Sequence, residues 1–147
     1  MRLIALDVGD KRIGVASSDL SRTIASPHSV INRIGFSKDV LAIKKIYDEL
    51  EAELIVIGLP RNMDGSIGFQ SEKVMMLVEK LNEAGLNTTL WDERLTTVIA
   101  NNALIEGNMR REDRRYTVDK IAASIILQSY LDSNKIKRSQ GSTQEEK

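Results

Sequence analysis

Residues 3–16 read LIALDVGDKRIGVA, two short apolar segments joined by a polar turn. The first segment is apolar on both faces, as in a strand buried inside a sheet, and the second is close enough to pair with it as a hairpin. Asp7 interrupts the first segment near its C-terminal end, on the same face as Leu3 and Ala5. An acid at that end of a strand can bind a ligand or start a turn, and this stretch alone favours neither interpretation.

The rest of the chain extends this hairpin into a mixed α/β fold. We expect Ser37 to cap the first helix through its side chain. Right-handed crossovers would give a mixed five-stranded sheet, three antiparallel strands followed by parallel additions, flanked by helices. The expected strands are 2–8, 13–19, 26–33, 54–57 and 88–92, and the expected helices are 37–51, 68–84, 96–105 and 118–131.

The composition limits the chemistry without identifying a partner. The net charge is zero, so only local clustering can indicate a nucleic-acid partner. Cysteine is absent and His28 is the only histidine, which excludes zinc sites, disulfide scaffolds and Cys or His nucleophiles. No apolar run suits a signal peptide or a membrane span, so we expect a cytoplasmic protein without membrane contact. We expect one domain at 1–134 and a disordered polar tail at 135–147.

Two further acids stand where packing would favour other side chains. Glu93 follows an expected strand directly, beside Asp92, and both acids could be solvated loop residues. Asp119 lies on the helical stripe that holds Ala123 and Ile126, where a carboxylate is costly unless it is paired or bound to metal. The alternative for Asp119 is an N-terminal helix acid that the helix dipole stabilises.

Oxygen ligands from two strand ends and a packed helix could converge on one site. Clustered carboxylates repel one another unless cations lie between them, and all-oxygen sites suit Mg²⁺ or Mn²⁺. A pair of such ions supports phosphodiester cleavage, and this chemistry needs no His or Cys. The candidate catalytic and metal-binding residues are therefore Asp7, Glu93 and Asp119.

Basic side chains neighbour each of these acids in the sequence, and they could hold substrate phosphates. An anion could also bind in the loop that begins at Gly58, because this loop leaves an expected strand and enters a helix. Charge balance on a solvated surface explains the same pattern, since Glu112 and Asp113 interrupt the last basic run. The candidate substrate-binding residues are Lys11, Arg12, Arg61, Asn62, Arg94, Arg114 and Arg115.

Four ordered motifs resemble the YqgF family of bacterial pre-16S rRNA nucleases, which has also been described as a family of Holliday junction resolvases. The resemblance covers roughly residues 1–134, and motifs in this order and spacing are highly specific. The motifs are DVGDKRIGVA at 7–16, GLPRNMDGS at 58–66, DERLTT at 92–97 and DKIAASIILQ at 119–128.

The resemblance implies an RNase H-like fold, a cytoplasmic protein and hydrolysis at the 5′ end of immature 16S rRNA during ribosome maturation, with a ribosomal subunit as a further partner. It also selects Glu93 over Asp92 as the acid that acts with Asp7 and Asp119. One departure is Thr117, where members often carry a lysine, so that nearby arginines would have to supply the charge.

Two other functions remain open from the sequence. A four-way DNA junction is an alternative substrate, and its symmetric cleavage would need a dimer. A non-catalytic module that binds nucleic acid or nucleotide is the other, because a strand ending in Asp-x-Gly before a hairpin also resembles the phosphate loop of actin-like ATPases. The sequence favours a metal-dependent endonuclease that acts on structured RNA.

Overall fold

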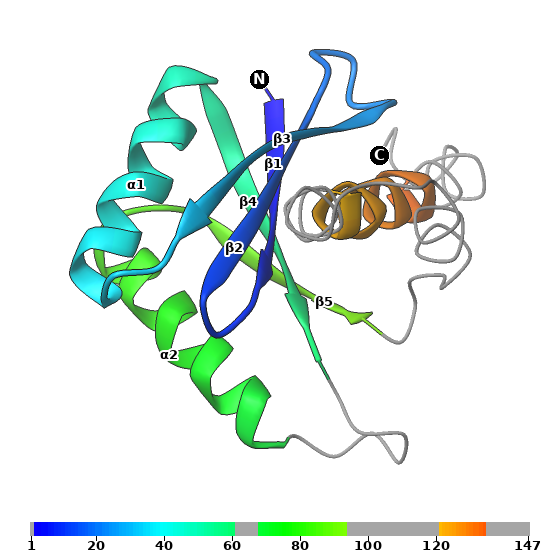
Figure 1. Cartoon of the computed structure of the whole chain (residues 1–147). Coiled ribbons are helices and arrows are strands. Elements are labelled where there is room, and N and C mark those ends of the chain that lie inside the picture. Colours follow the sequence, from blue (N-terminus) through cyan, green and yellow to red (C-terminus); the bar gives the residue numbers. More distant parts are fainter. Residues whose placement is uncertain (1, 61–67, 94–120, 135–147) are drawn as a thin grey trace, which may run out of the picture.

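The computed structural model describes residues 2–60, 68–93 and 121–134 (Figure 1). Within them the chain forms one sheet with helices on both faces, as the sequence predicts. The helix predicted at 96–105 and the polar tail predicted at 135–147 lie outside the described residues. No helix in the described part of the chain is long and apolar enough to cross a membrane.

The strands of the sheet are β1 (Arg2–Val8), β2 (Arg12–Ser18), β3 (Ala25–Asn32), β4 (Ala52–Leu59) and β5 (Thr88–Asp92). They lie in the order β3-β2-β1-β4-β5. β2 runs antiparallel to β1 and β3, whereas β4 and β5 run parallel to β1, so the predicted mixed sheet is confirmed. The carboxyl ends of β1, β4 and β5 therefore meet at one edge, where ligands bind in open α/β sheets.

Helices cover the two faces of the sheet unequally. The first face carries α1 (Phe36–Glu49) and α2 (Phe69–Glu83), and the second carries a C-terminal helix at 121–134, drawn in orange in Figure 1. The sheet therefore separates two layers of helices, and each layer buries its own apolar cluster.

β1 is buried on both faces because its residues alternate between these two clusters. Ile4 and Leu6 pack into the larger cluster, with α1 and α2, whereas Leu3 and Ala5 pack into the smaller one, with the C-terminal helix. Burial on both sides accounts for the continuous apolar run in this strand. Asp7 continues the series of Leu3 and Ala5, so it faces the C-terminal helix.

The start of α1 differs from the prediction of a side-chain cap at Ser37. The helix begins at Phe36, after Gly35, without a side-chain cap hydrogen bond. Asp39 in the first turn is buried, and its Oδ1 accepts a hydrogen bond of 3.1 Å from the backbone N–H of Ile34. A carboxylate in the first turn can reach back to loop N–H groups and is favoured by the helix dipole, so the capping serine is not needed.

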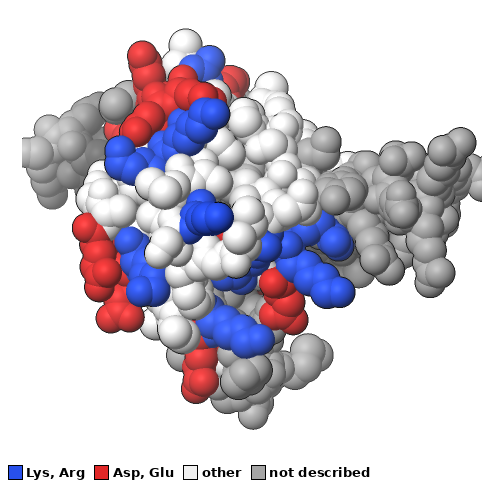
Figure 2. All heavy atoms as spheres, turned by 60° about the vertical axis from the view of Figure 1, so that its left-hand side comes forward, with Lys and Arg blue, Asp and Glu red and all other residues white. Residues whose placement is uncertain are grey.

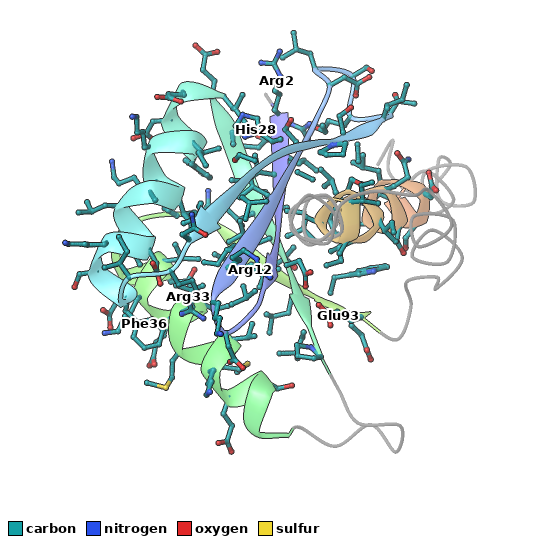
Figure 3. All side chains as sticks on the ribbon, in the orientation of Figure 1. Arg2, Arg12, His28, Arg33, Phe36 and Glu93 are labelled. Carbon is teal, nitrogen blue, oxygen red and sulfur yellow. The ribbon has the colours of Figure 1, made fainter. Side chains whose placement is uncertain are left out.

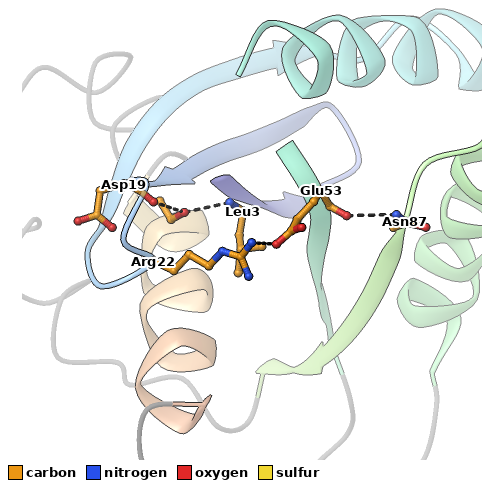
Figure 4. Close-up of polar contacts among 6 residues, drawn as sticks. Leu3, Asp19, Arg22, Glu53 and Asn87 are labelled. Carbon is orange, nitrogen blue, oxygen red and sulfur yellow. Dashed lines mark hydrogen bonds and ion pairs between the residues drawn. The ribbon is translucent and has the colours of Figure 1, made fainter. Parts of the chain in front are cut away.

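Polar contacts hold the sheet at the amino-terminal ends of the parallel strands (Figure 4). Ser18 Oγ accepts a 2.9 Å hydrogen bond from the backbone N–H of Leu3, and Asn87 Nδ2 donates a 3.2 Å bond to the carbonyl oxygen of Glu53. The Glu53 carboxylate also forms an ion pair with Arg22 of the β2–β3 turn. These contacts fix the starts of β1, β4 and β5 at the edge opposite the acids.

A glutamine fastens the C-terminal helix to the start of β3. Gln128 Oε1 accepts a 2.9 Å hydrogen bond from the backbone N–H of Ala25, and Gln128 Nε2 donates a 3.0 Å bond to the carbonyl of Thr23. On the same helix Ala123 and Leu127 are fully buried against the sheet. The helix is therefore held by apolar packing along its length and by polar contacts at the β2–β3 turn.

Candidate active site

Asp7 lies at the C-terminal end of β1, between β2 and β4. It pairs with Gly14 of β2, and the preceding Leu6 pairs with Ile57 of β4. Strand pairing therefore holds the backbone at this position from both sides. The Asp7 side chain is half-buried.

Glu93 is the first residue after β5, and its side chain lies over Gly58 of β4. Figure 3 shows Glu93 on the side of the sheet that carries the C-terminal helix. A Cβ atom on Gly58 would lie 2.6 Å from Glu93 Oε1 and 2.6 Å from Ile126 Cδ1, both far inside van der Waals contact. Gly58 therefore leaves the space in which the Glu93 carboxyl fits between the sheet and the helix.

The carboxyl groups of Asp7 and Glu93 lie within hydrogen-bonding reach of each other. Burial, the charge of Asp7, the hydrogen bond to Asp7 and the charge of Asp92 together raise the pKa of Glu93 from 4.5 to about 7. Burial is the largest of these causes, because a charged carboxylate loses its hydration in this position. Near neutral pH the pair therefore holds part of a proton, and a bound cation could replace it.

The donor set of this pair fits a hard divalent cation, since both ligands are carboxylate oxygens. Among residues 2–60, 68–93 and 121–134, no three His, Cys, Asp or Glu side chains gather closely enough to hold a metal ion. The third predicted acid, Asp119, lies outside these ranges. Ala123 and Ile126, which the sequence places on the same helical stripe as Asp119, are buried against the sheet.

The β1–β2 hairpin carries two of the predicted phosphate contacts. Lys11 is exposed in the turn, and Arg12 is half-buried at the start of β2. The backbone N–H of Gly9 donates a 2.8 Å hydrogen bond to the carbonyl of Arg12, which closes the turn. Two cationic residues, Lys11 and Arg12, therefore follow Asp7 closely in the sequence, across the β1–β2 turn. The other predicted phosphate contacts lie outside the described residues, namely Arg61, Asn62, Arg94, Arg114 and Arg115.

Sequence reasoning missed the side chains that brace this hairpin. Arg33, directly after β3, donates from Nη1 to the carbonyl of Gly9 at 2.9 Å and from Nε to Asp39 Oδ2 at 3.0 Å. Lys73 of α2 forms an ion pair of 3.4 Å with Asp10 in the turn. A single arginine after a strand carries no local signal, because its partner Gly9 lies 24 residues earlier in the chain.

The mixed five-stranded sheet with helices on both faces has the RNase H-like fold. RuvC of Thermus thermophilus in complex with a Holliday junction substrate has a TM-score of 0.59 to this chain at 11% identity, over 91% of this chain and 96% of that one. The fowlpox virus resolvase in complex with Holliday junction DNA gives 0.52 at 14% identity, over 90% and 98%. These likenesses establish the fold.

The sequence comparisons identify the family. The model described as "RuvX: Holliday junction resolvase" matches residues 1–133, so the chain belongs to this family, which is the YqgF family. Relatives named "Putative pre-16S rRNA nuclease" occur in Caldanaerobacter subterraneus subsp. tengcongensis, at 54% identity, and in Thermoanaerobacter pseudethanolicus, at 52%. The alignments cover 92% and 93% of this chain and 99% and 100% of those proteins. The chain is therefore an enzyme of the nuclease class, a hydrolase of phosphodiester bonds, which argues against the non-catalytic alternatives.

Proposed function

We propose that the chain is a metal-dependent endonuclease that matures the 5′ end of precursor 16S rRNA. The observation that carries the metal dependence is the Asp7–Glu93 pair at the carboxyl edge of the sheet, where the pKa of Glu93 is raised to about 7. Two carboxyls in contact favour a cation between them. The RNA substrate rests on the names of relatives that share more than half of their aligned residues with this chain.

In this proposal Asp7, Glu93 and Asp119 would hold one or two Mg²⁺ or Mn²⁺ ions, and the bound ions would supply an activated water and stabilisation of the leaving oxygen. The protein supplies the arrangement of the reacting groups. The β1 ladder fixes Asp7 and the space over Gly58 admits Glu93. Lys11 and Arg12 of the β1–β2 hairpin bind phosphates of the substrate, which sets its register.

We also infer where in the cell, and on which particle, the RNA is cut. Precursor rRNA matures within ribosomal particles, so the partner is a ribosomal subunit precursor and the site of action is the cytoplasm. Further phosphate contacts come from residues that follow β4 in the sequence, from the residue that follows Glu93 and from the arginines that precede Asp119. These contacts are Arg61, Asn62, Arg94, Arg114 and Arg115.

Cleavage of precursor 16S rRNA by the purified protein in Mg²⁺ or Mn²⁺ tests this function. We expect Asp7→Asn and Glu93→Gln each to lower the cleavage rate about 100-fold or more, because each removes a charged metal-binding oxygen. Asp48→Asn is the matched control, since Asp48 is an exposed acid that pairs with Lys44 on α1 at 3.1 Å. Cleavage that survives either Asp7→Asn or a metal chelator would contradict the mechanism.

A four-way DNA junction is the second candidate substrate, because the matching family model is described as a Holliday junction resolvase. Symmetric cleavage of two strands needs two copies of the site and hence a dimer. Sedimentation at the assay concentration, combined with a junction-cleavage assay, separates the two substrates. A monomer that cuts only RNA rules out the junction.

A further inference from the structure

Arg33 connects three elements of the fold, namely the end of β3, the first turn of α1 and the β1–β2 hairpin. Its side chain is only 14% exposed, and its guanidinium bonds both the carbonyl of Gly9 at 2.9 Å and Asp39 Oδ2 at 3.0 Å. Its Cζ atom lies 5.5 Å from the ring centre of Phe36, within range of a cation–π contact. Its backbone N–H donates a 2.9 Å bond to the carbonyl of Lys11. One residue thus holds the hairpin at two carbonyl groups.

Both carbonyls belong to the turn that joins β1 and β2. Gly9 and Lys11 flank Asp10 between the two strands, and the turn is also closed by the 2.8 Å bond from Gly9 to Arg12. A short turn at the end of two strands has little packing of its own, so its shape depends on such bonds. Figure 3 shows Arg33 and Phe36 on the α1 side of the sheet and Glu93 on the other side.

We propose that Arg33 is a positioning residue of the nuclease. Through the carbonyls of Gly9 and Lys11 it fixes the hairpin in the shape that presents Lys11 and Arg12 to the substrate phosphates. The inference rests on the proposed function, because it gives Arg33 a role in substrate binding at that same site. Asp39 holds the guanidinium through an ion pair that is almost completely buried on the Asp39 side.

We expect Arg33 to affect the binding of substrate and not the position of Asp7. Asp7 and Val8 are held by their own ladder partners, Gly14 and Ile13, and these pairs do not involve Arg33. Loss of the guanidinium therefore removes the side-chain bond to the Gly9 carbonyl and loosens the turn, while the backbone bond from residue 33 to Lys11 and the strand that carries Asp7 stay in place. A change in ground-state binding alone raises KM without lowering kcat.

The choice of variants follows from the burial of Asp39. Removing Arg33 alone would leave a carboxylate that is 1% exposed without its cation, and that change by itself can unfold a protein. The double variant Arg33→Met/Asp39→Asn removes both charges together, and the new amide oxygen can still accept the bond from Ile34 N–H. Arg33→Lys keeps the charge, but an ammonium group cannot span Gly9 and Asp39 as the planar guanidinium does.

Steady-state cleavage of precursor rRNA gives the first measurement. We expect the double variant to raise KM about 5- to 30-fold with kcat within about twofold of wild type, and Arg33→Lys to fall between the two. The matched control is Lys44→Met/Asp48→Asn. It removes an exposed ion pair from α1, the helix that also carries Asp39, and it should leave KM unchanged. An unchanged KM in the double variant, or a fall in kcat that matches the rise in KM, overturns the proposal.

Amide hydrogen exchange gives a second measurement that needs no cleavage. The Gly9 amide, which bonds the Arg12 carbonyl, should exchange faster in the double variant, while the amides of Leu6 and Val8 in the ladder keep their wild-type rates. An unchanged exchange rate of the Gly9 amide would overturn the proposal that Arg33 holds the turn. If the wild-type protein cleaves no RNA, the proposed function fails, and the dissociation constants of the same variants for RNA replace KM. These constants then test separately whether Arg33 acts as a positioning residue.

Discussion

Gly58 decides where the Glu93 carboxyl can lie. The atoms that a Cβ would meet belong to two flexible side chains, namely Glu93 Oε1, Glu93 Cγ and Ile126 Cδ1, so Gly58→Ala should fold with a modest loss of stability, about 1–3 kcal/mol. Because these atoms must move, the Glu93 carboxyl is displaced from Asp7. We expect kcat to fall at least about tenfold, measured beside the melting temperature.

Gly35→Ala is the matched control for this substitution. A Cβ atom on Gly35 would meet nothing within 4 Å, and its φ of 166° is extended backbone that any residue adopts. The control should therefore keep wild-type activity. Equal activity of Gly58→Ala and Gly35→Ala would show that the position of the Glu93 carboxyl does not limit the reaction.

The raised pKa of Glu93 has a consequence for the stability of the metal-free protein. Folding raises this pKa from 4.5 to about 7, so the folded state binds the proton more tightly than the unfolded chain. The resulting stability is complete below pH 4.5 and is lost as the pH rises through 7. Between pH 5 and pH 8 we expect wild type to lose on the order of 1–2 kcal/mol relative to Glu93→Gln, a range reduced from the full linkage value because the group is partly solvated.

Urea unfolding in the presence of a chelator measures this difference at both pH values. Taking the difference between the two proteins cancels the contribution of titrating groups that do not interact with Glu93, so that what remains belongs to Glu93 and its acidic neighbours Asp7 and Asp92. Parallel stability curves for wild type and Glu93→Gln would mean that the carboxyl is not buried against Asp7.

At the scale of elements, Gln128 provides a polar attachment between the C-terminal helix and the sheet. Gln128→Ala leaves the partly buried N–H of Ala25 without its acceptor, which should lower the free energy of unfolding by about 1–2 kcal/mol. Ser124→Ala is the control, because Ser124 Oγ bonds only the carbonyl of Ile121 within the helix among the contacts that the structure describes. Equal stability of the two variants would assign the attachment to apolar packing alone.

The bounds of the elements were predictable where local signals coincide with tertiary contacts. β5 has the predicted bounds, since Thr88 to Asp92 is a short run of β-forming residues that ends in an acid. β4 is longer than the predicted 54–57 at both ends. At its start Glu53 resembles a boundary residue, but its side chain pairs with Arg22 while its backbone continues the strand. At its end Gly58 and Leu59 pair with Trp91 and Asp92 of β5. Partners from distant segments are invisible to local patterns, and they account for this difference.

At the scale of the whole molecule, the sequence predicts which strand ends meet but not what stabilises their loops. Asp7 and Glu93 come together because β1 and β5 both run parallel to β4, and parallel strands bring their carboxyl ends to one edge. Arg33 and Asp39 brace the neighbouring hairpin through contacts that only the folded chain creates. The proximity of the two acids thus follows from the order and direction of the strands. The contacts that hold the hairpin depend on how side chains pack in the folded protein.

The helix that packs over Gly58 comes after the whole sheet in the order of synthesis. The sheet lies within residues 2–92, which are synthesised before the helix at 121–134. Because chains begin to fold from their N-terminal part during synthesis, a nascent sheet would carry Asp7 and Glu93 before Ile126 has been added. Ile126 then completes the packing around the Glu93 side chain over Gly58. The order of synthesis therefore delays the completed Asp7–Glu93 site until after the sheet that holds it has been made.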